Sequence, residues 1–311
     1  MPLDPQAKTF LEQLALQPGP TLATQTPAQA RAQMRAGTPL LGAPPPVAGL
    51  RDLVIPGQEG DLRIRVSTPE GPGPFPALVY YHGGGWVTGD VETHDALCRA
   101  LTNAAQAVVV SVDYRLAPEH PYPAAVEDSY VAAVWVASHA EELNVDPARI
   151  AVGGDSAGGN LAAVVALKAR DVGGPRLALQ VLIYPITDCD FDVSSYVENA
   201  DGYLLTREAM IWFWNHYVPD GARRTEPYAS PLRAADHSNL PPALVLTAEY
   251  DPLRDEGEAY AARLAQAGVP VTITRYSGMI HGFIRRYGMF DQGREALAEV
   301  ARALSTIEPV R

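Results

Sequence analysis

Short runs of apolar residues recur along the chain and alternate with segments long enough to form helices. The run over 62–66 alternates apolar and polar residues, which is typical of a strand with one exposed face. Later runs are almost continuously apolar, as expected for strands of a parallel sheet that is covered on both faces. These runs are 77–81, 107–112, 150–152, 179–184, 243–247 and 271–274. With helix-length segments such as 124–140 and 159–169 between them, the pattern predicts an α/β fold with a mostly parallel central sheet flanked by helices.

Two segments depart from this alternation. Residues 1–45 read as helical pieces separated by Pro and Gly, and they end in a Pro-rich linker. The second segment, 189–225, runs from an acidic loop into a helix that carries bulky apolar residues at positions i, i+3, i+4 and i+7: Met210, Phe213, Trp214 and Tyr217. Such an insertion would lie as a cap over the carboxyl edge of the sheet; alternatively, this face packs on the main core.

Composition and charge narrow the class of protein. The chain has 311 residues, of which 47% are hydrophobic and 19% charged, enough for one large domain with insertions. A net charge of −12 argues against nucleic acid as a partner and suits a small neutral substrate. No apolar run reaches the roughly 18 residues of a membrane span, and the amino terminus does not resemble a signal peptide. The chain has only two cysteines, Cys98 and Cys189, so we expect a cytoplasmic protein. The sequence leaves open whether these cysteines pair and whether the chain forms a homodimer.

The segment Gly154-Asp155-Ser156-Ala157-Gly158 follows directly on the apolar run 150–152 and opens a helix pattern. A serine between small residues at a strand-to-helix turn is typical of a nucleophile elbow, where the turn is too tight for large side chains. A serine hydroxyl reacts only when a base removes its proton. Ser156 as nucleophile therefore predicts a histidine and a carboxylate elsewhere in the chain.

A glycine-rich segment, His82-Gly83-Gly84-Gly85-Trp86, follows the strand that ends at Tyr81. Its glycines would let backbone N–H groups turn toward a developing negative charge. By itself the segment could equally be a phosphate loop or a plain turn, but it lacks the spacing of a dinucleotide site or a P-loop. Its place ahead of the elbow favours an oxyanion hole, with His82 as a structural anchor of the loop.

Asp251 and His281 are the candidate partners of Ser156. Asp251 follows the strand 243–247, at the end where open α/β sheets place their sites, although an Asp before Pro252 also suits a helix N-cap. His281 comes after Asp251, whereas every other histidine precedes it. The order Ser, acid, His is the one expected on a hydrolase sheet. The histidine spacing predicts no metal site, and we expect no cofactor.

Five motifs together make the chain resemble the bacterial hormone-sensitive-lipase-like esterases of the α/β-hydrolase superfamily. The motifs are 82–86, 113–119, 154–159, 251–255 and 281–283, in that order. The motif 113–119 is expected to serve structure, with Arg115 and Glu119 pairing to fix a loop.

The resemblance implies Ser156 as nucleophile, His281 as general base and then acid, and Asp251 as the residue that orients His281. The oxyanion hole would consist of the backbone N–H groups of Gly84, Gly85 and Ala157. It further implies a catalytic α/β-hydrolase domain over 46–188 and 226–311, and a helical cap built from 1–45 and 189–225.

The sequence therefore predicts a serine carboxylesterase that works through an acyl-enzyme on a small-molecule ester. Met210, Phe213 and Trp214 would wall the acyl pocket and restrict its depth, and the family resemblance implies acyl chains of about four to eight carbons. Amidase, lactonase and acyltransferase activity remain open alternatives, because they share the first half-reaction. A non-catalytic receptor on the same fold is disfavoured because all three triad residues are present.

Overall fold

The computed structural model describes residues 1–16 and 19–310, and within them eight strands form one sheet in the order β1-β2-β4-β3-β5-β6-β7-β8. From β4 to β8 neighbouring strands are parallel, whereas β2 is antiparallel to both β1 and β4. The strands are β1 Gly49–Pro56, β2 Asp61–Thr68, β3 Phe75–Tyr81, β4 Val108–Val112, β5 Val145–Asp155, β6 Leu179–Ile183, β7 Ala243–Tyr250 and β8 Val271–Ile280. The predicted α/β fold with a mostly parallel sheet is confirmed.

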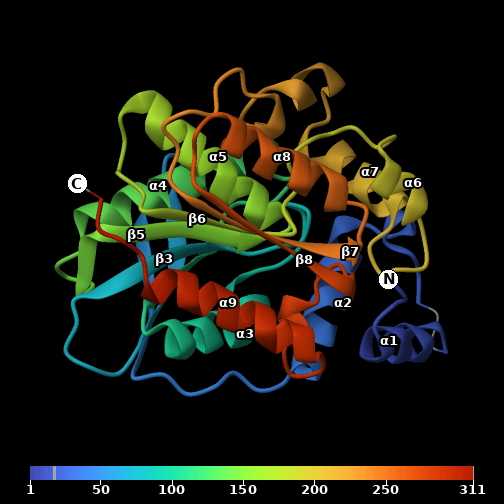
Figure 1. Ribbon diagram of the computed structural model, residues 1–311, viewed down its shortest axis with the longest axis horizontal. Helices are drawn as coiled ribbons and strands as arrows, with labels where there is room; N and C mark the ends of the chain where they lie inside the picture. Colours follow the sequence, from blue (N-terminus) through green and yellow to red (C-terminus); the bar gives the residue numbers. More distant parts are fainter. Residues whose placement is uncertain (17–18, 311) are drawn as a thin grey trace.

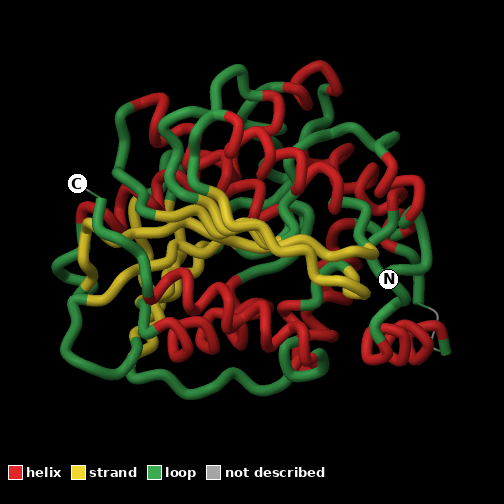
Figure 2. The backbone as a smooth tube through the Cα atoms, viewed as in Figure 1, coloured by secondary structure: helices red, strands yellow, loops and turns green. Residues whose placement is uncertain are grey.

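Helices cover both faces of the sheet. In Figure 1, α3 and α9 lie on one side of the strands and α4, α5 and α8 on the other, and Figure 2 shows the strands as a middle layer between the two. These helices are α3 Val91–Ala105, α4 Ala124–Ser138, α5 Ala157–Val172, α8 Arg254–Gln266 and α9 Asp291–Ser305. No helix within the described ranges is long and apolar enough to cross a membrane.

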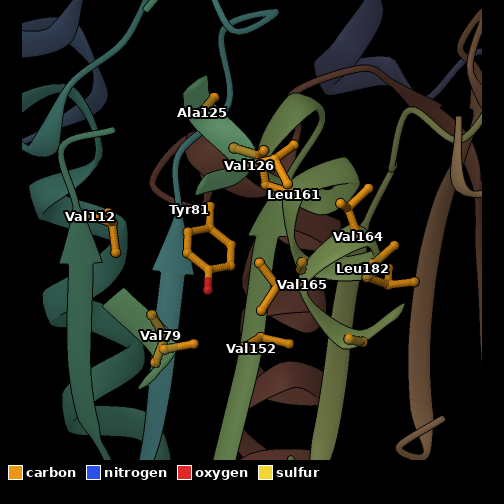
Figure 3. Packing of buried hydrophobic residues seen from close by; sticks show 14 of the residues in the cluster. Val79, Tyr81, Val112, Ala125, Val126, Val152, Leu161, Val164, Val165 and Leu182 are labelled. Carbon is orange, nitrogen blue, oxygen red and sulfur yellow. The ribbon is translucent and has the colours of Figure 1, made fainter. Parts of the chain in front are cut away.

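The core follows from the apolar runs. Every residue of β3, β4 and β6 is buried, because helices pack on both faces of these strands. In Figure 3, Val79 of β3 and Val152 of β5 lie in the same layer of packed side chains as Val165 of α5. Most of the continuous apolar runs are thus strands inside the sheet. The expectation is wrong for 271–274, which begins the edge strand β8 and is partly or fully exposed because no further strand covers it.

Strand β1 is the element that the apolar pattern does not reveal. It pairs only with β2 and is mostly exposed, so its side chains need not be apolar on either face. Its charged residues Arg51 and Asp52 stand between the exposed apolar residues Leu50 and Val54, so apolar and polar residues do not alternate along the strand.

The two segments predicted as a cap are mostly helical. Residues 1–45 form α1 Pro5–Ala15, η1 Leu22–Thr24, α2 Pro27–Gly37 and η2 Thr38–Leu41, and residues 189–225 form α6 Ser194–Glu198, α7 Arg207–Tyr217 and η3 Gly221–Thr225. In Figure 1, α1, α2, α6 and α7 lie at the end of the molecule toward which β7 and β8 point. The short helix η1 contacts α7, so the two segments meet.

Two side-chain pairings can be compared with the sequence. The predicted Arg115–Glu119 pair is wrong: Arg115 binds Asp128 of α4 at 2.9 Å, whereas Glu119 is bound by Arg31 of α2 at 2.6 Å. The two residues face different helices, each of which supplies its own charged partner. Cys98 and Cys189 are both free thiols in this structure.

Candidate active site

Ser156 occupies a strained turn between the end of β5 and the start of α5. Its φ of 59° and ψ of −119° lie outside the regions that L-residues favour. A Cβ on Gly154 or Gly158 would overlap the carbonyl oxygen of Tyr81, so both positions require glycine. The turn is also fixed from β6, because the Ser156 N–H donates to the carbonyl of Ile183 at 2.8 Å. This tight turn presents the Ser156 hydroxyl beyond the carboxyl end of the sheet.

The structure brings His281 between Ser156 and Asp251. Its Nε2 lies 3.0 Å from the Ser156 Oγ, and its Nδ1 lies 2.7 Å from Oδ2 of Asp251. Because a carboxylate can only accept, Nδ1 carries the hydrogen, and Nε2 presents its lone pair to the serine hydroxyl. A neutral imidazole held this way can take the hydroxyl proton.

Asp251 makes hydrogen bonds both to the imidazole of His281 and to its own loop. Its side chain is fully buried, and while Oδ2 faces His281, Oδ1 accepts from the Leu253 N–H at 2.9 Å. Asp251 is not the helix N-cap that the sequence left as an alternative, because α8 begins at Arg254 with Leu253 as its N-cap and without a side-chain cap bond. The histidine and the Leu253 N–H contact the two different oxygens of one carboxylate.

Helix α6 of the 189–225 segment secures the loop that carries Asp251. The Ser195 hydroxyl donates to the Pro252 carbonyl at 2.6 Å, and the Asn199 amide donates to the Asp251 carbonyl at 3.3 Å. Sequence reasoning missed both residues, since nothing in an isolated Ser or Asn indicates a partner more than fifty positions away.

In the glycine loop 82–86, the carbonyls of Gly83 and Gly84 have hydrogen-bond partners within the protein. The Gly83 carbonyl accepts from His82 Nδ1 at 2.8 Å, and the Gly84 carbonyl accepts from the Thr88 N–H at 2.9 Å. Gly84 and Gly85 take φ values of 122° and 60°, which glycine adopts without strain. Across the described residues, the N–H groups of Gly84, Gly85 and Ala157 donate to no protein acceptor. These are the three donors that the sequence predicts for an oxyanion hole.

His82 anchors this loop, as its sequence position suggests. Its ring stacks on Tyr114 with 4.2 Å between centroids, and the Tyr114 hydroxyl donates to the His82 carbonyl at 2.7 Å. Burial lowers the pKa of His82 to about 3, so the imidazole is neutral at ordinary pH. A neutral ring can be buried without a counter-charge.

The apolar face of α7 packs against the same loop. A Cβ on Gly85 would overlap the ring of Phe213, so this side chain lies directly on the loop. Trp86 is stacked on Tyr217 at 4.0 Å and meets Trp214 edge-on at 5.1 Å.

Met210 and Trp214 are only 1% and 0% exposed and belong to the main core cluster, as the alternative interpretation of this helix face expects. Phe213 belongs to the same cluster and lies against Gly85, and Trp214 contacts Trp86 of the same loop.

Tyr184 is a further neighbour that the sequence analysis did not select. Its ring lies 4.5 Å from the ring of His281, and its φ of 35° places it in the left-handed region. The available signal was its place directly after β6, where parallel strands deliver residues to the site. Among residues 1–16 and 19–310, no cluster of three or more His, Cys, Asp or Glu side chains could hold a metal ion.

Comparisons with known proteins agree with this geometry. A family model described as α/β hydrolase fold matches residues 78–285. The carboxylic ester hydrolase LipN of Mycobacterium tuberculosis is 46% identical over 280 residues, which cover 88% of this chain and 74% of that protein. The ethyl acetate hydrolase of Pseudomonas putida is 40% identical over 262 residues, 82% of each chain.

Solved structures extend the likeness to the whole chain. A hyperthermophilic esterase from the archaeon Pyrobaculum calidifontis has a TM-score of 0.95 and 49% identity, and the match covers 98% of this chain and 99% of that one. The fold and the enzyme class predicted from the sequence are confirmed: this chain belongs to the hormone-sensitive-lipase-like esterases of the α/β-hydrolase superfamily and is a carboxylic ester hydrolase.

Proposed function

We propose that the chain is a serine carboxylesterase in which Ser156 attacks the ester carbonyl, His281 takes the serine proton and Asp251 orients the imidazole. The observation that carries this proposal is the continuous hydrogen-bonded chain from Oγ to Nε2 and from Nδ1 to the buried carboxylate. Asp251 stabilises the imidazolium that forms as Oγ bonds to the carbonyl carbon.

The free N–H groups of Gly84, Gly85 and Ala157 receive the oxyanion of the tetrahedral intermediate. Donors fixed in place before the reaction stabilise charge that develops only in the transition state, and losing one costs about 3 kcal/mol in comparable sites. The loop supplies two of these donors and α5 the third, and none of the three gives up a protein acceptor to do so among the described residues.

The alcohol leaves when His281 returns the proton to the leaving oxygen, and an acyl-enzyme on Ser156 remains. Water then repeats the attack with His281 as base, and the acid product and free enzyme result. These steps use only side chains and backbone groups of this chain.

We further propose that residues 1–45 and 189–225 form a cap over a catalytic domain of 46–188 and 226–311. The contact of η1 with α7 supports a single cap. Its connection to the site is supported by Arg31 of α2, which donates to the carbonyls of Val87 and Ala117 at 2.8 Å each, just beyond the glycine loop.

The proposed substrates are esters of short to medium acyl chains. Phe213 lies on the glycine loop and would limit the depth of the pocket, and Met210 and Trp214 are buried on the same helix. The likeness to an ethyl acetate hydrolase supports small acyl groups. Amidase, lactonase and acyltransferase activity are the alternative functions, because they share the first half-reaction. The proposed location is the cytoplasm.

Steady-state hydrolysis of a series of p-nitrophenyl esters tests this function. We expect an optimum in the range of about four to eight carbons and loss of turnover in Ser156→Ala. An optimum at sixteen carbons would contradict the substrate class. Wild-type turnover by Ser156→Ala would contradict the mechanism.

A further inference from the structure

Asp155, the residue directly before Ser156, is a buried carboxylate that the ester chemistry does not use. It is 2% exposed, and no hydrogen bond joins it to Ser156, His281 or Asp251 among the described residues. A buried carboxylate is costly unless its oxygens have partners, so its surroundings indicate what it does.

One partner of Asp155 belongs to the glycine loop. The Gly83 N–H donates to its Oδ1 at 3.0 Å, and the Tyr80 hydroxyl of β3 donates to the same oxygen at 2.7 Å. The packing is close, because a Cβ on Gly83 would come within 2.5 Å of Oδ2. The carboxylate therefore joins the nucleophile turn to the loop at the residue before Gly84.

The peptide group between His82 and Gly83 is held from both ends. Asp155 accepts from its N–H, and the Tyr114 hydroxyl donates to its carbonyl at 2.7 Å. With this peptide plane held, only the φ and ψ of Gly83 separate it from the next peptide, whose N–H belongs to Gly84. A shift of about 1 Å in a reacting group can cost about 100-fold in rate.

A second partner connects Asp155 to the loop that carries His281. The His94 Nε2 of α3 lies 3.3 Å from Oδ1, and the carbonyl of the preceding Thr93 accepts from Arg285 at 3.0 Å. Burial raises the pKa of Asp155, but this effect is outweighed by the nearby His94, Arg285 and Tyr80. The pKa of Asp155 therefore lies well below its usual range. The carboxylate is ionised and so can accept from every donor around it.

We propose that Asp155 is a positioning residue that sets the oxyanion loop against Ser156 through the Gly83 N–H, with Tyr114 holding the opposite end of the same peptide. This inference rests on the proposed function, since it assigns a role to the geometry of the oxyanion donors. A carboxylate that merely stabilised the fold would affect folding but not the transition state of the folded enzyme.

The test compares Asp155→Asn with Asp128→Asn. Asp128 is also a buried carboxylate that accepts a backbone N–H, from Arg115 at 2.9 Å, but among the described residues it makes no hydrogen bond to the glycine loop. For Asp155→Asn we expect kcat to fall about 10- to 100-fold with KM changed less than about threefold. Affinity for an alkyl boronic acid, which becomes tetrahedral on Ser156, should fall in parallel with kcat. Asp128→Asn should lower the melting temperature but keep kcat.

Tyr114→Phe keeps the proposal testable if Asp155→Asn does not fold. It removes one hydroxyl and keeps the ring on His82, and we expect kcat to fall about 3- to 10-fold with weaker boronate binding and unchanged KM.

A folded Asp155→Asn enzyme with kcat within about twofold of the wild type would overturn the proposal, and so would unchanged kcat in Tyr114→Phe. Ser156→Ala separates the two hypotheses. If Ser156→Ala is inactive while these variants keep full kcat, only the positioning role fails; if Ser156→Ala is active, the proposed function itself fails.

Discussion

The ring of Phe213 on α7 lies directly against Gly85 of the glycine loop, so closely that no side chain fits at position 85. The two residues are 128 positions apart and come from the 189–225 segment and the sheet domain. The proposed acyl pocket and the proposed oxyanion loop therefore meet at one contact.

Phe213→Ala should broaden the range of acyl chains. Removing the ring opens space beside the expected oxyanion donors, so we expect kcat/KM for a twelve-carbon ester to rise about tenfold relative to the four-carbon ester. Trp214→Ala and Met210→Ala test the rest of the predicted pocket in the same p-nitrophenyl series. An unchanged profile in all three variants would remove this helix face from the acyl pocket.

Gly85→Ala should abolish most of the activity. The new methyl group would displace either Phe213 or the loop, and we expect kcat to fall at least about 100-fold. Gly173→Ala is a matched control, because Gly173 has a φ of 64° against 60° at Gly85, but open space where the new methyl group would lie. It should cost about 1 kcal/mol of stability and leave kcat unchanged. Equal kinetic effects at both positions would argue against the contact.

Asp251→Asn should lower kcat by about four orders of magnitude while the protein stays folded, since an amide favours the wrong tautomer of His281. Asp255→Asn, four residues later, is the control: Asp255 pairs with Arg254 and accepts from the Ser195 N–H, with no contact to His281. We expect its kcat to stay within about threefold of the wild type. Comparable losses in both variants, measured by steady-state hydrolysis, would contradict the assignment of Asp251.

Glu256 should make the stability of the protein fall as pH rises. Its side chain is buried, one oxygen accepts from the Thr187 N–H at 2.9 Å, and the other has no partner among the described residues. Burial raises the pKa of Glu256 well above the ordinary value of about 4.3. Because the pKa of Glu256 is higher in the folded protein than in the unfolded chain, its contribution to stability is fully present at pH below the unfolded-state pKa. That contribution is lost as pH rises through the folded-state pKa.

Glu256→Gln removes this titration, so its melting temperature relative to the wild type should increase between pH 5 and pH 8. Differential scanning fluorimetry across that range measures the effect, with the exposed Glu142→Gln as control. A difference that stays constant with pH would show that Glu256 is already ionised in the folded protein.

The sequence predicts what depends on burial and local turns, and it misses what depends on distant contacts. The central strands were predictable because two covered faces demand continuous apolar runs, whereas the exposed edge strand β1 carries no such demand. Ser156 was predictable because its turn needs glycine neighbours within the same segment. The partners of Arg115 were not, because Asp128 and Glu59 reach it only after α4 and the turn between β1 and β2 have packed.

The reactivity of Ser156 toward a fluorophosphonate tests the central claim most directly. Peptide mass spectrometry should locate one adduct on Ser156 in the wild type, labelling in His281→Ala should be slower by about 1,000-fold, and Ser156→Ala should remain unlabelled. Rapid labelling at another residue, or full esterase activity in a wild-type protein that the probe does not modify, would contradict the account.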